Sequence, residues 1–350
     1  MLEKKELNVD FEDEEISFEV DADVKEEFLD KQLKSTRDSY RHILKLADVF
    51  ERKLGKSVYD FNNDERDELL NVQFKNKSIF AFQAVLSPLK TYVDFCISPK
   101  NLVKHNQNRF STIITSNYKD YVNSQAVENS YIPLEKNREF QKGLANDQDK
   151  LILEYLGLGI RGRTEKGNTL EEPVNLKVED VDFEKKVIYL TSNDGEIRHL
   201  PVDDYTLDLT KRVINQTFYV FGNGFATKPN DDGTYDKTEK GFVINPTEYV
   251  FRVPGKNKFG KADHQLFANR IQRIQKWLLA QDYLEAQYIT ISNLYFSAMI
   301  DFAKKIKDEK GMLEKNDYIK INENFNFGVG NGSKYIFKTR EIMKIYLGEE

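Results

Sequence analysis

The stretch LILEYLGLGIRGRTEKG, residues 151–167, combines three features that decide the C-terminal fold. An apolar run of the kind that forms a buried helix comes first, closely spaced glycines follow, and two arginines, Arg161 and Arg163, come last. Glycine ends helices because it adopts positive φ at little steric cost. The spacing therefore predicts a buried helix that stops in a tight turn, and a turn that presents guanidinium groups.

Strand and helix patterns follow this turn. The segments KVIYLTS and IRHLPV flank Asn193, Asp194 and Gly195, which tolerate positive φ and so predict a β-hairpin. Residues 222–246 are rich in Gly, Asn and Asp and predict a loop or an extra hairpin. Apolar spacing predicts helices at about 263–281, 287–308 and 339–347. The fold class expected is mainly α with a small β-sheet (α+β).

The N-terminal part of the chain reads as a small helical bundle. Tyr40, Ile43, Ala47, Phe50 and Leu54 share one helix face, and Gly55 stops that helix. Another apolar stripe begins after residue 77. We expect four parts: an acidic N-terminal arm at 1–35, a helical domain at 36–128, a linker at 129–140 and a second domain at 141–350.

Charge is distributed unevenly along the chain. Residues 1–30 hold 13 acidic and 3 basic side chains, a net charge of −10, whereas the whole chain has −6, so the remainder is at +4. The acidic segment is either a solvated, mostly disordered tail or an interaction arm whose Phe11, Ile16, Phe18 and Val20 dock on a partner.

Several kinds of site are excluded. Cys96 is the single cysteine, so neither an internal disulfide nor a cysteine-built metal site is expected. The four histidines show no metal-ligand spacing, and GLGIRG is not followed by the Gly-Lys-Ser/Thr of a P-loop. We expect no cofactor and no metal. No apolar run nears a membrane span, so we expect a cytoplasmic protein without a membrane partner.

Two basic segments point to an extended anion. Residues 98–119 contain no acid, and residues 252–276 contain one, Asp263. Such charge runs are often only solvated faces, but Lys and Arg that neutralise phosphates dominate the affinity of proteins for DNA. The side chains expected to contact double-stranded DNA are Lys100, Lys104, His105, Arg109, Lys119, Arg161, Arg163, Lys256, Lys258, Lys261, Arg270 and Arg273.

Residues 151–202 resemble the segment of tyrosine recombinases (phage integrases) that carries their first catalytic arginine. In that family an apolar helix ends at a Gly-hydrophobic-Arg turn, and a Glu-x-x-x-Leu helix, an Asp-hydrophobic-Asp element and a β-hairpin follow. Arg161 matches the arginine, Leu176 the leucine, and EDVDF the acidic element. The resemblance covers about residues 36–350. It implies a core-binding domain followed by a tyrosine-recombinase catalytic-like domain that holds DNA.

The resemblance also implies catalytic residues that this chain lacks. The family's second arginine lies in a His-x-Leu-Arg-His segment, where this chain has Ser292 for the first histidine, Tyr295 for the arginine and Phe296 for the second histidine. No lysine lies near the hairpin turn at residues 191–193. The nucleophile position matches Tyr346, or less well Tyr335, and a core role suits Tyr346 equally.

Three hypotheses stay open. The first is a sequence-specific DNA-binding regulator without strand exchange, similar to the integrase-like repressors of temperate Bacillus phages, with no catalytic residues expected. It would bind operator-like sites in the bacterial host and self-associate, or bind a regulator, through the acidic N-terminus or the C-terminal helix. The second is an active, divergent recombinase that uses Arg161 and Tyr346. The third is a protein-interaction module built on the acidic N-terminus.

Overall fold

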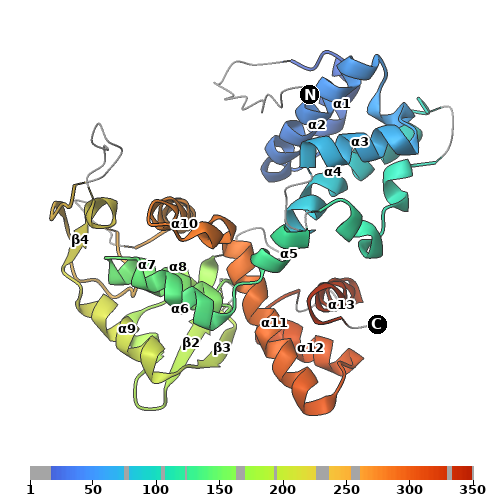
Figure 1. Cartoon of the computed structure of the whole chain (residues 1–350). Helices are drawn as coiled ribbons and strands as arrows, with labels where there is room; N and C mark the ends of the chain where they lie inside the picture. Colours follow the sequence, from blue (N-terminus) through green and yellow to red (C-terminus); the bar gives the residue numbers. More distant parts are fainter. Residues whose placement is uncertain are drawn as a thin grey trace. The chain divides into compact units, whose positions relative to one another are not determined.

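The computed structural model describes residues 17–74, 79–103, 107–122, 124–162, 170–192, 195–225, 236–253, 261–328 and 333–348. The chain divides into two compact units, residues 1–127 and 128–350, and each is treated by itself. The predicted class is confirmed: both units are mainly helical, and the described strands form two small antiparallel sheets (Figure 1). No helix in the described part of the chain is long and apolar enough to cross a membrane.

Unit 1 is built from helices. Gly55 ends the longest of them with φ of +65°, as the sequence predicts, and the core includes Leu44, Phe50, Phe82 and Tyr92. Its α-helices are α1 (Ala22–Asp30), α2 (Lys34–Leu54), α3 (Asn63–Phe74), α4 (Ile79–Ile97) and, running across the boundary between the units, α5 (Ser124–Ser130). Short 3-10 helices lie at Val58–Asp60, Arg109–Thr112 and Thr115–Asp120.

The N-terminal segment differs from the predicted arm, because residues 17–35 are part of unit 1. Helix α1 packs on α2 and α4, and Phe18 is buried beneath the cationic groups of Lys25 and Arg41. The fully buried Lys25 ammonium donates to the carboxylates of Asp48, at 2.7 Å, and Glu51. The acidic composition suggested a solvated tail, but Phe18 and Lys25 supply apolar and basic anchors that the net charge conceals. Phe11 and Ile16 lie outside the described residues.

Unit 2 is organised around α7 (Asp147–Gly157), whose residues Leu151 to Leu156 are all buried. Helix α7 packs against α6, α9, α10 and α11, while α11, α12 and α13 pack on one another (Figure 1). The other α-helices are α6 (Leu134–Lys142), α8 (Glu171–Asn175), α9 (Asp204–Asn215), α10 (His264–Leu279), α11 (Ile291–Lys310), α12 (Lys315–Asn324) and α13 (Ser333–Leu347). Short 3-10 helices lie at Val178–Asp180, Phe221–Gly224 and Leu284–Tyr288.

Two antiparallel sheets complete unit 2. Strands β1 (Val181–Asp182), β2 (Val187–Thr191) and β3 (Ile197–Pro201) pair in that order, and Ile188 lies opposite Leu200. The β2–β3 pair confirms the predicted hairpin, although Asn193 and Asp194 lie outside the described residues. Strands β4 (Phe218–Val220) and β5 (Gly241–Val243) form the second sheet. Of the predicted range 222–246 it contains only β5, β4 lies just before that range, and residues 226–235 lie outside the described residues.

Candidate nucleic-acid interface

The turn after α7 has the geometry that its glycines require. The amide of Gly159 donates to the carbonyl of Leu156 at 3.0 Å, and that of Ile160 donates to Tyr155 at 2.9 Å, which closes the helix. Gly159 has φ of +78°, and a Cβ there would lie 2.3 Å from the Phe325 ring. The buried side chain of Ile160 anchors the turn, so the next residue, Arg161, is delivered at a defined position.

A buried carboxylate holds this turn. Glu172, at the start of α8 and fully buried, accepts from the amide of Arg161 at 2.9 Å and from Asn326 Nδ2 at 3.0 Å. It also accepts from Nε and Nη2 of Arg198 at 2.6 and 2.7 Å. Paired, charge-assisted contacts of this kind are strong and directional. Glu172 thus ties together the α7 turn, α8, β3 and the segment after α12.

Arg198 is an arginine fully engaged by the fold. Besides Glu172, its guanidinium donates to the carbonyls of Gly159, at 2.8 Å, and Asn324, at 2.9 Å. Burial lowers the pKa of Arg198, but the Glu172 carboxylate outweighs burial and holds that pKa above its usual value. All three of its nitrogens have acceptors, so Arg198 positions the turn rather than offering a free charge.

Arg161 is held differently. Its guanidinium carbon lies 4.9 Å from the centroid of the Tyr295 ring, and the Tyr295 hydroxyl donates to the carbonyl of Phe325 at 2.7 Å. Arg161 Nε has no acceptor within the described residues, and burial lowers the pKa of Arg161. The side chain stays partly exposed. A cation on an aromatic platform, with no carboxylate partner among the described residues, has the chemistry to attract an anion.

The positions expected to carry the second arginine and histidine belong to an aromatic core. Tyr295 and Phe296 are buried on α11, and their rings lie 5.4 Å apart. Phe325 and Phe327 pack against them, with centroids 5.6 to 6.3 Å away. Ser292, in the first turn of α11, is partly exposed. The described residues therefore place no second guanidinium from α11 beside Arg161.

The two candidate nucleophiles lie in different surroundings. Tyr346, on α13, has its ring 6.3 Å from that of Tyr131 and a hydrogen bond with Ser130, and burial raises the pKa of its hydroxyl. Tyr335 instead lies 5.5 Å from Phe327, in the aromatic cluster beside Tyr295. Of the two, Tyr335 is the one joined to the Arg161 surroundings through ring contacts.

Arg270, a predicted DNA contact on α10, is engaged inside the fold. Arg270 is buried, donates to Gln148 Oε1 at 3.1 Å and lies 3.6 Å from the Asp149 carboxylate. Residues three apart rotate by about 60° around a helix at each step, so 270, 273 and 276 span about 120°. The first position falls on the buried side, and Arg273 and Lys276 remain exposed. Lys261 is also exposed and donates to Asn175 Oδ1 at 3.1 Å.

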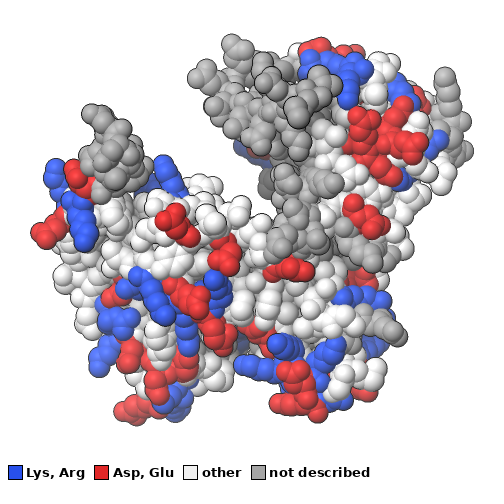
Figure 2. Space-filling view, viewed as in Figure 1, with Lys and Arg blue, Asp and Glu red and all other residues white. Residues whose placement is uncertain are grey.

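The other predicted contacts are partly engaged or lie outside the described residues. In unit 1, Lys100 pairs with Glu27, and Arg109 donates to the carbonyl of Phe61. On the face drawn in Figure 2, the described basic and acidic side chains are interspersed. The structure does not describe Lys104, His105, Arg163, Lys256, Lys258 or the side chain of Lys119.

Sequence reasoning missed Glu172, Arg198 and Asn326. A signal for Arg198 was present, since it lies two residues before the buried Leu200 on β3 and so shares the inward face of that strand. Glu172 is also the first residue of the Glu-x-x-x-Leu pattern that ends at Leu176. As to metals, the described residues contain no group of three or more His, Cys, Asp or Glu side chains that could hold an ion.

Two family models match the two parts of the chain. The family model described as "MrpR, C-terminal catalytic domain" matches residues 131–347, and "MrpR, N-terminal core-binding domain" matches residues 20–98. The SPbeta prophage-derived uncharacterized protein YopR of Bacillus subtilis (strain 168) is 24% identical over 330 residues, 94% of each chain. A crystal structure of XerA recombinase aligns over 91% of this chain and 93% of that one, at 13% identity and a TM-score of 0.36. Because the catalytic-domain model alone spans well over half of the sequence, the chain belongs to the MrpR family of tyrosine-recombinase-like, phage integrase-like proteins.

Proposed function

We propose that this protein is a sequence-specific, double-stranded DNA-binding regulator of a phage that does not exchange strands. The observation that carries the proposal is the state of Arg161. Its cation rests on Tyr295 without a carboxylate partner in the described structure. Tyr295 and Phe296 are buried at the positions where the resemblance expects a second arginine and a histidine. This arrangement favours phosphate binding over phosphoryl transfer.

Energetics separates the two activities. Removing one charge-stabilising donor typically costs an enzyme roughly 3–4 kcal/mol of transition-state stabilisation. DNA binding is spread over many phosphate contacts, so it survives such losses. Exposed Arg273, Lys276 and Lys261 supply further cations in unit 2. The prophage origin of the YopR relative supports a phage regulator, a repressor of lytic genes that maintains lysogeny.

Gel shifts on DNA from the protein's own control region test the binding. We expect an affinity that falls steeply with salt, and about tenfold weaker binding with a shallower salt slope for Arg161→Gln. Arg212→Gln is the matched control, because Arg212 is an exposed arginine that already pairs with Asp147 at 3.3 Å. The absence of any salt-sensitive shift contradicts the proposal.

A nicked substrate tests the lack of strand exchange. A nick next to the scissile phosphate traps a covalent protein–DNA adduct if a tyrosine attacks. We expect no adduct with the wild-type protein. An adduct that Tyr346→Phe or Tyr335→Phe abolishes identifies an active recombinase instead, and it names the nucleophile.

A further inference from the structure

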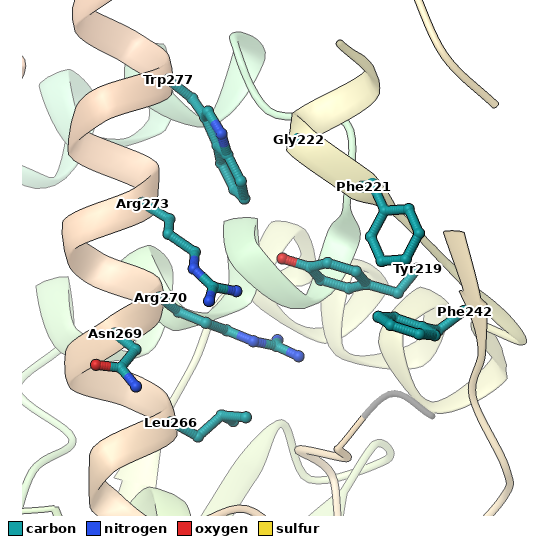
Figure 3. A pocket seen from close by; sticks show the side chains of 9 residues that line it. All are labelled: Tyr219, Phe221, Gly222, Phe242, Leu266, Asn269, Arg270, Arg273 and Trp277. Carbon is teal, nitrogen blue, oxygen red and sulfur yellow. The ribbon is translucent and has the colours of Figure 1, made fainter. Parts of the chain in front are cut away.

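A pocket of about 190 Å³ lies between α10 and the β4–β5 hairpin, and none of its lining residues is among those described around Arg161. Figure 3 shows Arg270, Arg273 and Trp277 reaching from α10 towards Tyr219 and Phe242 of the hairpin. Phe221 completes the aromatic lining. The volume suits a molecule with a single ring, since pockets for drug-sized ligands start at roughly 300 Å³.

The aromatic lining is only partly used by the fold. The rings of Phe221 and Phe242 meet edge to face at 4.4 Å, yet Phe242 is 45% exposed. Trp277 is partly exposed as well. Tyr219, by contrast, is buried, and its hydroxyl donates to Asp149 Oδ2 at 2.8 Å. The pocket therefore combines a rigid wall at Tyr219 with open ring faces at Phe242 and Trp277.

Two arginines in this lining have different partners. Arg270 is buried, with its guanidinium carbon 4.7 Å from the Tyr219 centroid and Asp149 within 3.6 Å. Arg273, one turn further along α10, is exposed and makes no hydrogen bond or ion pair with the described residues. Asp149 is the carboxylate that faces Arg270. Asp149 also interacts electrostatically with Arg273. Two guanidinium groups thus share one carboxylate, and the described lining of the pocket keeps an excess positive charge.

We propose that this pocket binds a small molecule that carries one aromatic ring and one carboxylate. The ring packs between Phe242 and Trp277, where it buries the apolar surface that these side chains expose. The carboxylate accepts a bidentate pair of hydrogen bonds from Arg273, the geometry that guanidinium groups favour. Arg270, which lies 3.6 Å from the Asp149 carboxylate, adds to the positive potential of the pocket. The proposal does not depend on DNA binding.

Trp277 provides the readout, because it is the only tryptophan of the chain. Its fluorescence is titrated with benzoate, phenylacetate and 3-phenylpropanoate, and in parallel with the corresponding neutral amides. We expect a saturable change with at least one carboxylate, and binding at least tenfold weaker for its amide. The full-length protein is used throughout.

Two variants locate the site. Arg273→Gln should weaken carboxylate binding at least tenfold, whereas Arg212→Gln, which removes an equal charge on α9, should leave it unchanged. Phe242→Ala, at a partly exposed position, should weaken the acid and its amide alike, and circular dichroism checks that each variant is folded. The proposal is overturned if none of the carboxylates gives a saturable change, if acid and amide bind equally, or if Arg273→Gln binds like the wild type.

Discussion

At the scale of single residues, the environment of each arginine decides its role. Glu172 contacts both arginines, but its carboxylate accepts hydrogen bonds from the guanidinium of Arg198 only. Glu172 contacts Arg161 through the backbone amide and leaves the side chain to Tyr295. Arg198 therefore holds the turn together, whereas the Arg161 guanidinium has no carboxylate partner among the described residues.

Glu172→Ala should be strongly destabilising. The change leaves the buried Arg198 guanidinium without its carboxylate, and breaking such a pair by removing one partner costs roughly 3–5 kcal/mol. Chemical denaturation followed by Trp277 fluorescence measures the unfolding of unit 2. Glu179→Ala is the control, since Glu179 is exposed and should change the free energy of unfolding by less than about 0.5 kcal/mol. An equally small change in the free energy of unfolding for Glu172→Ala contradicts the role of Glu172 in holding the turn.

Tyr295 should act on DNA binding through its ring. Tyr295→Leu removes the aromatic platform beneath Arg161, worth roughly 1 kcal/mol, so the affinity for DNA should fall about fivefold. Tyr295→Phe keeps the ring and loses the hydrogen bond to Phe325, so it should lower stability more than affinity. Gel shifts and denaturation of both variants separate the two effects. Equal DNA affinity of the two variants rules out the platform.

At the scale of elements, two junctions hold the units in their observed form. In unit 2 the α7 turn passes beneath Phe325 and leaves no room for a Cβ at residue 159. In unit 1 the carboxylate of Asp48, on α2, accepts from the amides of Glu19 and Val20 at 3.2 and 3.0 Å and from Lys25 at 2.7 Å. Both junctions join segments that are remote in the sequence.

Gly159→Ala should destabilise unit 2 by more than the strain of placing an alanine at a positive φ. Gly159 and Gly195 both have positive φ, but a Cβ meets the Phe325 ring only at residue 159 and open space at 195. We expect about 1 kcal/mol for Gly195→Ala and roughly 2–4 kcal/mol for Gly159→Ala. Thermal or chemical denaturation compares them, and equal losses exclude the contact as the cause.

Asp48→Asn should weaken the docking of α1 in a pH-dependent way. Burial raises the pKa of Asp48, but hydrogen bonds from Lys25 and Val20 outweigh burial and hold that pKa below its usual value. A carboxylate whose pKa is lowered in the folded protein stabilises the fold at pH values above its unfolded pKa of about 4. That stabilisation is lost as the pH falls through the folded pKa. The advantage of wild type over Asp48→Asn should thus be full at neutral pH and vanish in acid.

Hydrogen exchange of residues 22–30 measures this docking. The comparison with Asp48→Asn is needed because burial raises the pKa of the neighbouring Glu51, which therefore contributes with the opposite sign as pH falls. Glu51 is common to both proteins, so its contribution largely cancels in the difference. A difference between the proteins that does not change with pH contradicts the role given to Asp48.

At the scale of the whole molecule, Arg273 belongs to both the proposed DNA-binding surface and the proposed ligand pocket. This side chain is an exposed cation of α10 expected to contact phosphate, and it also lines the aromatic pocket. One guanidinium cannot pair fully with a phosphate and with a carboxylate. If both proposals hold, ligand and DNA compete for the same charge, and the pocket becomes a means of control.

An aromatic carboxylate that binds the pocket should therefore lower the affinity for DNA. By thermodynamic linkage, DNA should lower the affinity for the carboxylate ligand by the same factor. Gel shifts with and without ligand, and Trp277 titrations with and without DNA, measure the two factors. The neutral amide is the control and should have no effect. Independent binding of the two partners shows that Arg273 serves only one of them.

The sequence by itself determined the features that depend on neighbours along the chain. Apolar periodicity determined helices such as α2 and α10, turn chemistry determined the β2–β3 hairpin, and the glycines after α7 determined the turn that presents Arg161. The spacing of motifs was also enough to indicate the family. These features are local because φ preferences and side-chain periodicity act over a few residues.

Only the tertiary structure decided which charges are buried and with whom they pair. The burial of Arg270 beside Asp149, the bidentate pair of Arg198 with Glu172 and the docking of Phe18 and Lys25 on α2 join residues 23 to 121 positions apart. Composition placed Arg270 on the surface and residues 17–35 in an arm. The physical reason is that a charged side chain is stable inside only where the fold brings an opposite charge to it, and such partners leave no pattern in the local sequence.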